Sequence, residues 1–321
     1  MNADQINVLF EELFNDLEEA DDVRTGRPLL AHYTSIQVLE SILKNEELWF
    51  SNPLFMNDLE EVRFGIIEGI NAFQLTDKLE KRISDKEYVN LLRGSLTIWY
   101  EQFDKEHLIN IYAFCLSQHD GSNDDGILSM WRGYGGNGSG VALVFDANKI
   151  PIREDTPFVM AKVDYATTID RKKWVDNLID KICNIINENK IPKEHASLCT
   201  YWYFERLKMF ALTTKHSGFS EEKEWRVLYL PYRDPNGALN KYFDYWIGPT
   251  GIQPKLKLKL GEIQNFTEPG FSLSNILKHI ILGPSLSSPL SQASALKMFD
   301  KIRPDLKDRV LVSRIPYRRE G

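Results

Sequence analysis

Residues 127–146, ILSMWRGYGGNGSGVALVFD, combine a short helical pattern, a glycine-rich turn and a buried strand, in that order. Gly133, Gly135 and Gly138 match the spacing GxGxxG. In a dinucleotide-binding fold a strand precedes these glycines and a helix follows them, so that the helix N-terminus faces the pyrophosphate. The order here is the reverse. It argues against that fold and indicates a glycine-rich hairpin or a helix C-cap, or else a place where a ligand approaches the backbone.

Strand and helix patterns on both sides of this stretch predict the fold class. Strands are expected at 29–35, 108–117, 224–230, 279–285 and 310–315. Helical patterns cover 3–20, 78–107 and 167–215, the last broken near Pro192. Helices gathered in blocks, without strict strand–helix alternation, are typical of an α+β fold. We expect an N-terminal helix and loop over 1–28, then one domain over 29–321 with helical insertions near 78–107 and 167–215.

Composition excludes several classes of protein. The 321 residues include 39 Lys and Arg against 46 Asp and Glu, for a net charge of −7. This balance argues against a protein that coats nucleic acid or an anionic membrane through bulk positive charge, although a local basic groove is compatible with it. The three cysteines form no CxxC pair, which argues against a disulfide framework or a structural zinc site. No signal-peptide pattern and no apolar run of about 20 residues occurs, so we expect a cytoplasmic protein with no membrane partner.

Common catalytic motifs are missing from the chain. The six histidines form no HExxH pair, and neither a GxSxG elbow nor a P-loop is present. Zinc, hydrolase and kinase templates are therefore unsupported, and we expect no metal site.

Two aromatic-rich blocks are candidate ligand contacts. His32 and Tyr33 end the first predicted strand, where an imidazole and a phenol are either core residues or partners for a ribose or base. Met130, Trp131 and Tyr134 lie beside the glycines, as a core anchor or as a wall for a planar ring.

The segment SEEKEWRVLYL (220–230) is the candidate acidic site. Strand alternation would place Glu222, Glu224 and Arg226 on one face. These residues form either a solvated edge or the lining of a cleft. In a cleft, a carboxylate stabilises an oxocarbenium-like centre and orients a nucleophile, and a neighbouring Arg keeps it ionised.

Several blocks together resemble a bacterial family of domains of unknown function. The blocks are HYT, NPxxxND, MWxxY, GV and ExEWR, and they recur in this order over roughly residues 29–285. That family in turn resembles the ADP-ribosyltransferase fold, in its toxin-like branch. The resemblance implies a split pair of antiparallel sheets that grip NAD as a substrate.

The resemblance also implies three stations for NAD. The first, which binds the adenosine ribose, corresponds to His32, with Tyr33 and Thr34 beside it. The second lines the nicotinamide pocket and corresponds to Ser117 or to Tyr134, between which the sequence does not choose. The third is Glu224, which meets the nicotinamide ribose, with Glu222 as accessory acid. Trp131 joins the aromatic wall, and Asn57 with Asp58 either fixes a loop or touches the ligand. The STS triplet of better-known transferases is absent.

The implied function is that of an NAD-dependent ADP-ribosyltransferase-like toxin or anti-phage effector. Its acceptor would be a protein or a nucleic acid, and an antitoxin is a candidate partner. The alternatives are an NAD hydrolase, a noncatalytic module that binds a nucleotide or peptide, and an interaction protein in which these blocks are only core. The transferase hypothesis requires His32, Glu224 and either Ser117 or Tyr134 around one cleft.

Overall fold

A computed structural model of the chain describes residues 1–15, 28–56, 59–150, 156–248, 251–263, 266–267 and 269–317. Its contacts divide the chain into two compact units, both built from separate segments. The first, here called the helical unit, comprises Met1–Asp22, Pro53–Ile111 and Lys162–Phe219. The second, the sheet unit, comprises Val23–Asn52, Tyr112–Ala161 and Ser220–Gly321. The fold is mixed α+β, as the grouping of helical and strand patterns predicts.

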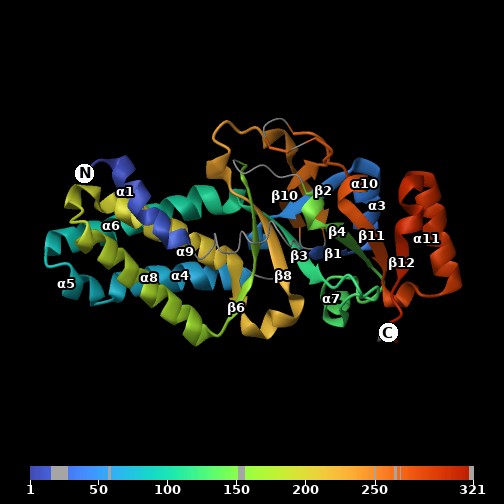
Figure 1. The fold of residues 1–321 in the computed structure, drawn as a ribbon, viewed down its shortest axis with the longest axis horizontal. Helices are drawn as coiled ribbons and strands as arrows, with labels where there is room; N and C mark the ends of the chain where they lie inside the picture. The colour runs from blue at the N-terminus through green and yellow to red at the C-terminus, as the bar shows by residue number, and fades with distance from the viewer. Residues whose placement is uncertain are drawn as a thin grey trace. The chain divides into compact units, whose positions relative to one another are not determined.

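The helical unit packs around one central helix (Figure 1). Its helices are α1 (Ala3–Phe10), α4 (Leu59–Leu75), α5 (Lys78–Arg82), α6 (Lys86–Gln102), α8 (Thr168–Glu188) and α9 (Ala196–Thr213), with the short parallel strands β6 (Asp164–Ala166) and β7 (Thr214–His216). Helix α9 is buried on almost every side and contacts α1, α4, α6 and α8. Gly65 and Gly69 allow α4 to approach it closely, since a Cβ at Gly69 would lie 2.3 Å from Leu207. Both predicted helical insertions therefore belong to this unit, together with α1 and α4.

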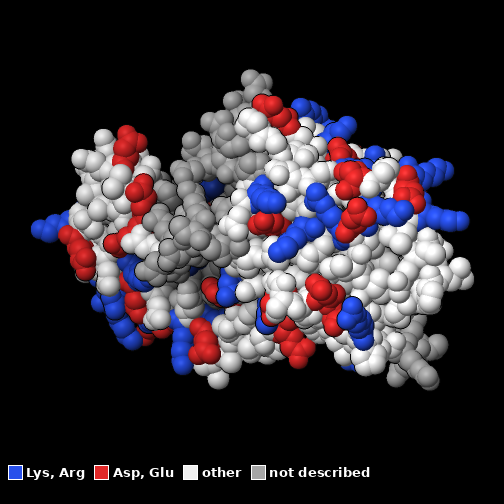
Figure 2. Space-filling view, turned by 45° about the vertical axis from the view of Figure 1, so that its right-hand side comes forward, with Lys and Arg blue, Asp and Glu red and all other residues white. Residues whose placement is uncertain are grey.

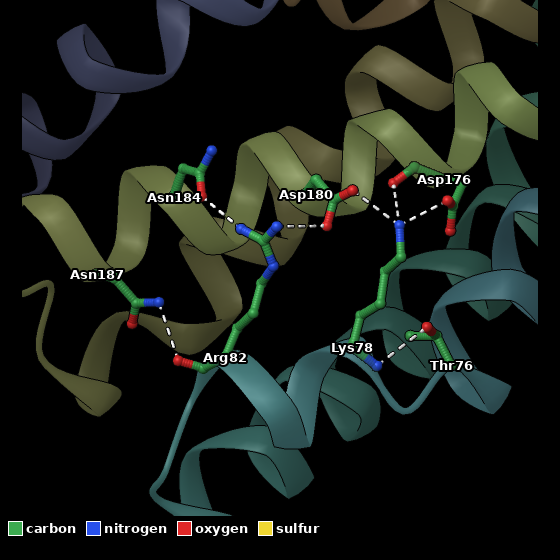
Figure 3. Close-up of polar contacts among 7 residues, drawn as sticks. All are labelled: Thr76, Lys78, Arg82, Asp176, Asp180, Asn184 and Asn187. Carbon is green, nitrogen blue, oxygen red and sulfur yellow. Dashed lines mark hydrogen bonds and ion pairs between the residues drawn. The ribbon is translucent and has the colours of Figure 1, made fainter.

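Polar contacts join α5 to α8 at the surface of the helical unit (Figure 3). The Lys78 ammonium donates to Asp176 at 2.5 Å and to Asp180 at 2.7 Å. Arg82 donates to Asn184 at 2.6 Å and pairs with Asp180 at 3.2 Å. Partial burial opposes the charged form of Lys78, but the bonds from the two carboxylates outweigh it and raise the pKa of Lys78. These charged contacts therefore add to the packing of the buried Leu79 in α5.

Removing this contact is expected to cost little. Lys78→Met should lower the free energy of unfolding by about 1 kcal/mol or less, and by less in high salt, because the ion pairs are partly exposed and screened. Lys81→Met is the matched control, because Lys81 pairs with the exposed Asp77 at the N-cap of α5 and, among the described residues, with no carboxylate of α8. Urea denaturation of both variants tests this. A loss at Lys78 that is large and independent of salt would contradict a screened surface contact.

In the sheet unit the described strands form a ten-stranded sheet. Its order is β12-β11-β4-β1-β3-β2-β10-β9, and β8 pairs with both β3 and β5. The strands are β1 (Leu29–Thr34), β2 (Glu47–Ser51), β3 (Tyr112–His119), β4 (Val141–Asp146), β5 (Phe158–Lys162), β8 (Glu224–Tyr229), β9 (Phe243–Gly248), β10 (Gly251–Lys259), β11 (Leu277–Leu282) and β12 (Val310–Val312). Strands β11 and β12 run parallel, whereas β1, β2, β3, β4, β8, β9 and β10 pair antiparallel.

The sheet is split along one edge of β3. Strand β8 pairs with β3 from Tyr112 to Ser117. On the opposite edge, β1 pairs only as far as Ala31 with Ser117, and β2 pairs at Ser51 with Ala113. Strand β1 therefore leaves β3 where β2 approaches it, and neither pairs with Cys115 in the register. This divergence is the structural feature around which the candidate site lies.

Each face of the sheet has its own apolar cluster and its own helices. The larger cluster, on what we call the α3 face, includes Leu30, Phe114, Val227 and residues of α3 (Ile36–Asn45). With it lie α10 (Leu273–Ile276) and residues of α11 (Pro289–Ile302). The smaller cluster, on the α7 face, contains Ala31, Tyr33, Ala142, Val144 and Ile281, with Met130 and Trp131 of α7 (Leu128–Gly133). Side chains alternate between the two faces along each strand.

Candidate functional site

Glu224 and Arg226 form a buried ion pair at the start of β8. Glu224 is 5% exposed and Arg226 is 3% exposed. The guanidinium donates from Nε to Oε1 at 2.8 Å and from Nη2 to Oε2 at 3.0 Å. Such a two-pronged contact fixes the plane of the carboxylate. The residues are two positions apart on a strand, so both side chains project from the same face, as the alternation predicts.

Ser117 lies opposite Glu224 in the register of β3 and β8. Ser117 also pairs with Ala31, which places Ser117, Glu224 and Arg226 on the α7 face. The Ser117 hydroxyl is fully buried and donates to the backbone carbonyl of Glu222 at 2.6 Å. Ser117 therefore holds the turn that leads into the acidic strand.

Glu222 and Tyr134 meet beside this pair. The sequence pattern predicts Glu222 on the same strand as Glu224, but the strand begins at Glu224 and Glu222 ends a 3₁₀ turn. Lys223 between them is left-handed, with φ 43°, which turns the chain at this point. The Tyr134 hydroxyl donates to Oε1 of Glu222 at 3.0 Å, and its side chain is 38% exposed. Both candidates for the second station, Ser117 and Tyr134, therefore converge on one turn.

His32 occupies the split in the sheet and faces away from this group, so the structure does not bring His32 and Glu224 around one cleft as the transferase hypothesis requires. It pairs with Leu143 in the register and stacks on Phe114 at 4.4 Å, which places it on the α3 face. Its Nδ1 bonds the Cys115 carbonyl at 2.9 Å, where β1 no longer pairs with β3. Burial lowers the pKa of His32, and the hydrogen bond to Cys115 only partly opposes this. Because a carbonyl only accepts, Nδ1 carries the proton in the neutral ring, and Nε2 is the accepting nitrogen.

The other predicted contacts are distributed over both faces. Tyr33 and Trp131 are core residues of the α7 face, with ring centroids 4.9 Å apart. The Tyr33 hydroxyl accepts from the Ile127 amide at 2.9 Å, and burial raises its pKa to about 12. Trp131 is fully buried and donates to the Asp125 carbonyl at 2.9 Å. Thr34 is buried and follows His32 on the α3 face. Asn57 and Asp58 lie outside the described residues.

A polar residue that the sequence patterns did not single out lies on the same face. Lys255 of β10 pairs with Ser51, and Ser51 pairs with Ala113 of β3, so all three share the α7 face with Glu224. The lysine is 8% exposed. The alternation KLKLKL over 255–260 was the signal that could have identified it.

A histidine pair is buried on the α7 face. His119 ends β3 and His279 lies on β11, with ring centroids 5.5 Å apart. Within the described chain, neither Nε2 atom has a hydrogen-bond partner. Burial lowers the pKa of His119 to about 4, helped by His279 and Lys278 and opposed by Asp120 and Asp124. Burial also lowers the pKa of His279. The fold therefore favours the neutral form of both rings.

We expect this pair to make the fold sensitive to acid. The unfolded chain binds a proton at each histidine near pH 6.5, whereas folded His119 stays neutral down to about pH 4. Above pH 6.5 the folded and unfolded chains therefore both hold His119 neutral, and the free energy of unfolding is at its full value. Between pH 6.5 and about pH 4 only the unfolded chain binds this proton, so the free energy of unfolding falls by about 3 kcal/mol from His119.

Urea titrations between pH 7.5 and 4 test the contribution of the pair. His119→Leu removes the proton-binding group, so the slope of the unfolding free energy against pH should flatten. The stability of the variant at pH 7.5 serves as its own reference. An unchanged slope would show that the acid sensitivity lies elsewhere.

Comparisons with known proteins find a match to one family model over part of the chain and point to no reaction. Residues 130–227 match the model of a family described as a protein of unknown function, DUF2971. This stretch includes Tyr134, Glu222 and Glu224 and lies within the predicted resemblance over 29–285. No curated protein and no solved structure matches the chain. In the residues that the structure describes, no group of three or more metal-ligating side chains gathers. Among the described helices, none has both the length and the apolar character needed to cross a membrane.

Proposed function

We propose that the sheet unit cleaves the nicotinamide–ribose bond of NAD and transfers ADP-ribose to a macromolecule. The observation that carries this proposal is the grouping of Ser117, Tyr134, Glu222 and Glu224 on the α7 face beside a split in the sheet. These residues come from separate parts of the chain. Their grouping and the split resemble the arrangement expected for an ADP-ribosyltransferase-like fold. In this proposal the protein is a toxin-like or anti-phage effector.

Glu224 takes the central role because two bonds from Arg226 hold its carboxylate in a fixed plane. A carboxylate has about four acceptor sites, and the two bonds from Arg226 occupy two of them. In this proposal the Glu224 carboxylate accepts a hydrogen bond from the 2′-hydroxyl of the nicotinamide ribose. Nicotinamide leaves as a neutral group, and positive charge develops on the sugar. A fixed carboxylate stabilises that charge without reorganising during the reaction.

The neighbouring residues have distinct roles in this proposal. Tyr134 is exposed enough to offer its ring to nicotinamide, and its hydroxyl orients Glu222. Glu222 then directs the acceptor nucleophile toward the sugar. Ser117 is a positioning residue, since it is fully buried and bonds the backbone of Glu222. At the second station, Tyr134 therefore contacts nicotinamide and Ser117 supports the backbone of Glu222.

In this proposal His32 binds NAD at the split in the sheet and not on the α7 face. Its Nδ1 satisfies the Cys115 carbonyl that neither β1 nor β2 pairs with in the register. Its Nε2 is the atom left to accept a hydrogen bond from a hydroxyl of the adenosine ribose. NAD would then lie across the divergence of β1 from β3, with its two riboses on different sides of that edge.

The second candidate function is a noncatalytic nucleotide-binding module. The observation that favours it is the burial of Glu224 and Arg226, both under 6% exposed. A pair this deeply buried also fits a purely structural role. Such a module would bind NAD without turning it over.

Nicotinamide release from NAD separates these functions. The protein is incubated with NAD carrying a biotin on its adenine ring, alone and with bacterial lysate, RNA or single-stranded DNA. A transferase releases nicotinamide and leaves biotin on an acceptor. A hydrolase releases nicotinamide and gives free ADP-ribose as the only other product. Binding of NAD in calorimetry without any release under these conditions would overturn the enzyme proposal in favour of the binding module.

A further inference from the structure

Three strands at one end of the sheet present lysines and indoles on the α7 face. Lys255, Lys257 and Lys259 alternate along β10 with leucines that pack into the core of the α3 face. Trp49 of β2 lies opposite Lys257 in the register. Trp246 of β9 lies on the same face, opposite Gln253. We call this set of five side chains the lysine–indole platform.

The indole of Trp246 lies against Gly248 of the same strand. A Cβ at Gly248 would lie 2.2 Å from its ring, so the glycine leaves the space that the ring occupies. The side chain is 37% exposed although β9 is the last strand on this side of the sheet. The Lys255 ammonium lies 5.9 Å from the ring centroid. An exposed, supported indole beside a cation is a stacking surface for a planar ring.

Trp49 is supported in a similar way. The Lys257 ammonium lies 4.7 Å from its ring centroid, and the indole N–H donates to Glu47 at 3.4 Å. Lys257 also pairs with Asp244 at 2.7 Å. The carboxylates of Glu47 and Asp244 therefore orient this half of the platform and partly neutralise it.

Lys255 has a charge that the described residues do not balance. Its Nζ donates to the Ser51 hydroxyl at 2.7 Å, and no carboxylate of the described chain forms an ion pair with it. An ammonium has three donors, so this bond uses one. Burial lowers the pKa of Lys255, which means that the folded chain itself disfavours the charged form. A phosphate at this position would supply the missing negative charge.

The basic character continues past the end of β10. Lys259 lines a hollow of about 500 Å³ together with Lys44, Lys301 and Arg303. Two of these cations have carboxylate partners, since Arg303 pairs with Glu46 and Asp305, and Lys44 pairs with Glu40. Figure 2 shows basic and acidic side chains interspersed over the face in view. With a net charge of −7, attraction of a polyanion has to come from a local surface such as this one.

We propose that the lysine–indole platform binds single-stranded nucleic acid, with a base stacked on Trp246 and phosphates along Lys255, Lys259 and the adjoining hollow. Stacking on an indole requires an unpaired base, which favours a single strand over a duplex. Lysines spaced along one strand match a ligand with repeated phosphates better than a ligand with a single carboxylate. This inference rests on the proposed function: the bound nucleic acid is the acceptor of ADP-ribose, because the platform shares a sheet face with Glu224.

Fluorescence anisotropy with labelled oligonucleotides tests the binding without any need for catalysis. The full chain is titrated against fluorescein-labelled dT20 and U20, with a duplex of the same length and a poly-glutamate peptide as comparisons. We expect both single strands to bind, with the two arms showing whether DNA or RNA is preferred. Trp246→Ala should weaken binding about tenfold, the effect of losing one stacked base. Tyr245→Ala is the matched control, since Tyr245 is 57% exposed on the same strand but points to the other face.

Salt dependence provides a second, independent readout. Lys259→Gln should lower the slope of log affinity against log salt by about 1, because one phosphate contact is lost. Lys105→Gln, an exposed lysine of the helical unit, should leave the slope unchanged. If Trp246→Ala fails to fold, Trp246→Phe and Lys259→Gln carry the test.

The outcomes separate the platform from the catalytic proposal. No binding of dT20 or U20 at low salt, equal effects of Trp246→Ala and Tyr245→Ala, or preferential binding of duplex or poly-glutamate would overturn the platform. Binding that depends on Trp246, in a protein that never releases nicotinamide, would support the platform and overturn the proposed function alone. Transfer of ADP-ribose to protein without oligonucleotide binding would do the reverse.

Discussion

Replacing Glu224 with Gln is expected to lower the rate of nicotinamide release by about 10²–10³-fold. The amide has nearly the same shape but no charge, so it cannot stabilise the positive sugar. It also loses one hydrogen bond from Arg226, because the amide NH₂ is a donor and stands where one carboxylate oxygen accepted from the guanidinium. Release is measured by chromatography at saturating NAD. Affinity for NAD, measured by calorimetry, should change far less than the rate.

Glu221→Gln is the matched control for Glu224. Glu221 is exposed on the 3₁₀ turn that precedes β8 and takes no part in the proposed site, so its substitution should leave the rate unchanged. Glu224→Asp keeps the charge but moves the carboxylate, so it distinguishes the effect of displacing the carboxylate from the effect of removing its charge. Thermal unfolding of each variant shows whether it is folded. Equal rates for a folded Glu224→Gln variant and the unsubstituted protein would remove Glu224 from the chemistry.

Replacing Trp131 with Ala is expected to destabilise the chain by about 3–5 kcal/mol. The indole is fully buried on the α7 face, against Tyr33, and its N–H bonds the Asp125 carbonyl. Truncation leaves a large cavity and removes one of the hydrogen bonds that the Asp125 carbonyl accepts, while the bond from the Ser313 hydroxyl remains. Trp131→Phe fills most of the space and should cost less, chiefly through the lost hydrogen bond.

NAD binding distinguishes this structural role of Trp131 from the ligand-wall role that the sequence suggests. Folded Trp131→Phe should bind NAD with unchanged affinity, whereas Tyr134→Ala should weaken binding because Tyr134 is the exposed ring of this block. Urea denaturation and calorimetry provide the two measurements. A stable Trp131→Ala variant with weak NAD binding would instead support the ligand-wall role.

Much of the fold follows from local patterns, because burial on alternate positions is visible in single strands. LLAHYT, YAFCLS and EWRVLY are strands, and the break near Pro192 separates α8 from α9. Strand pairing is a different matter. Strands β1 and β2 share one edge of β3 through contacts between residues more than 60 positions apart. A local sequence pattern does not predict such contacts. Strands β9 and β10 were not predicted, although KLKLKL alternates clearly.

The candidate site shows the same limit at the level of single residues. Pairing of Glu224 with Arg226 follows from strand alternation alone. The position of Glu222 does not, because a left-handed Lys223 ends the alternation one residue before β8. Adjacent residues also separate: Tyr33 packs on the α7 face, whereas His32 points to the α3 face. His32 and Tyr33 are thus adjacent in the sequence but lie on opposite faces of the sheet.

A crystal structure of Glu224→Gln with NAD bound most directly tests the central claim, that the acidic group on the α7 face binds the reacting ribose. The substitution is expected to leave NAD intact during crystallisation. We expect the 2′-hydroxyl of the nicotinamide ribose within hydrogen-bond distance of the side chain at position 224, with nicotinamide against Tyr134. NAD bound elsewhere on the chain, with the face of Ser117 and Glu222 unoccupied, would contradict it.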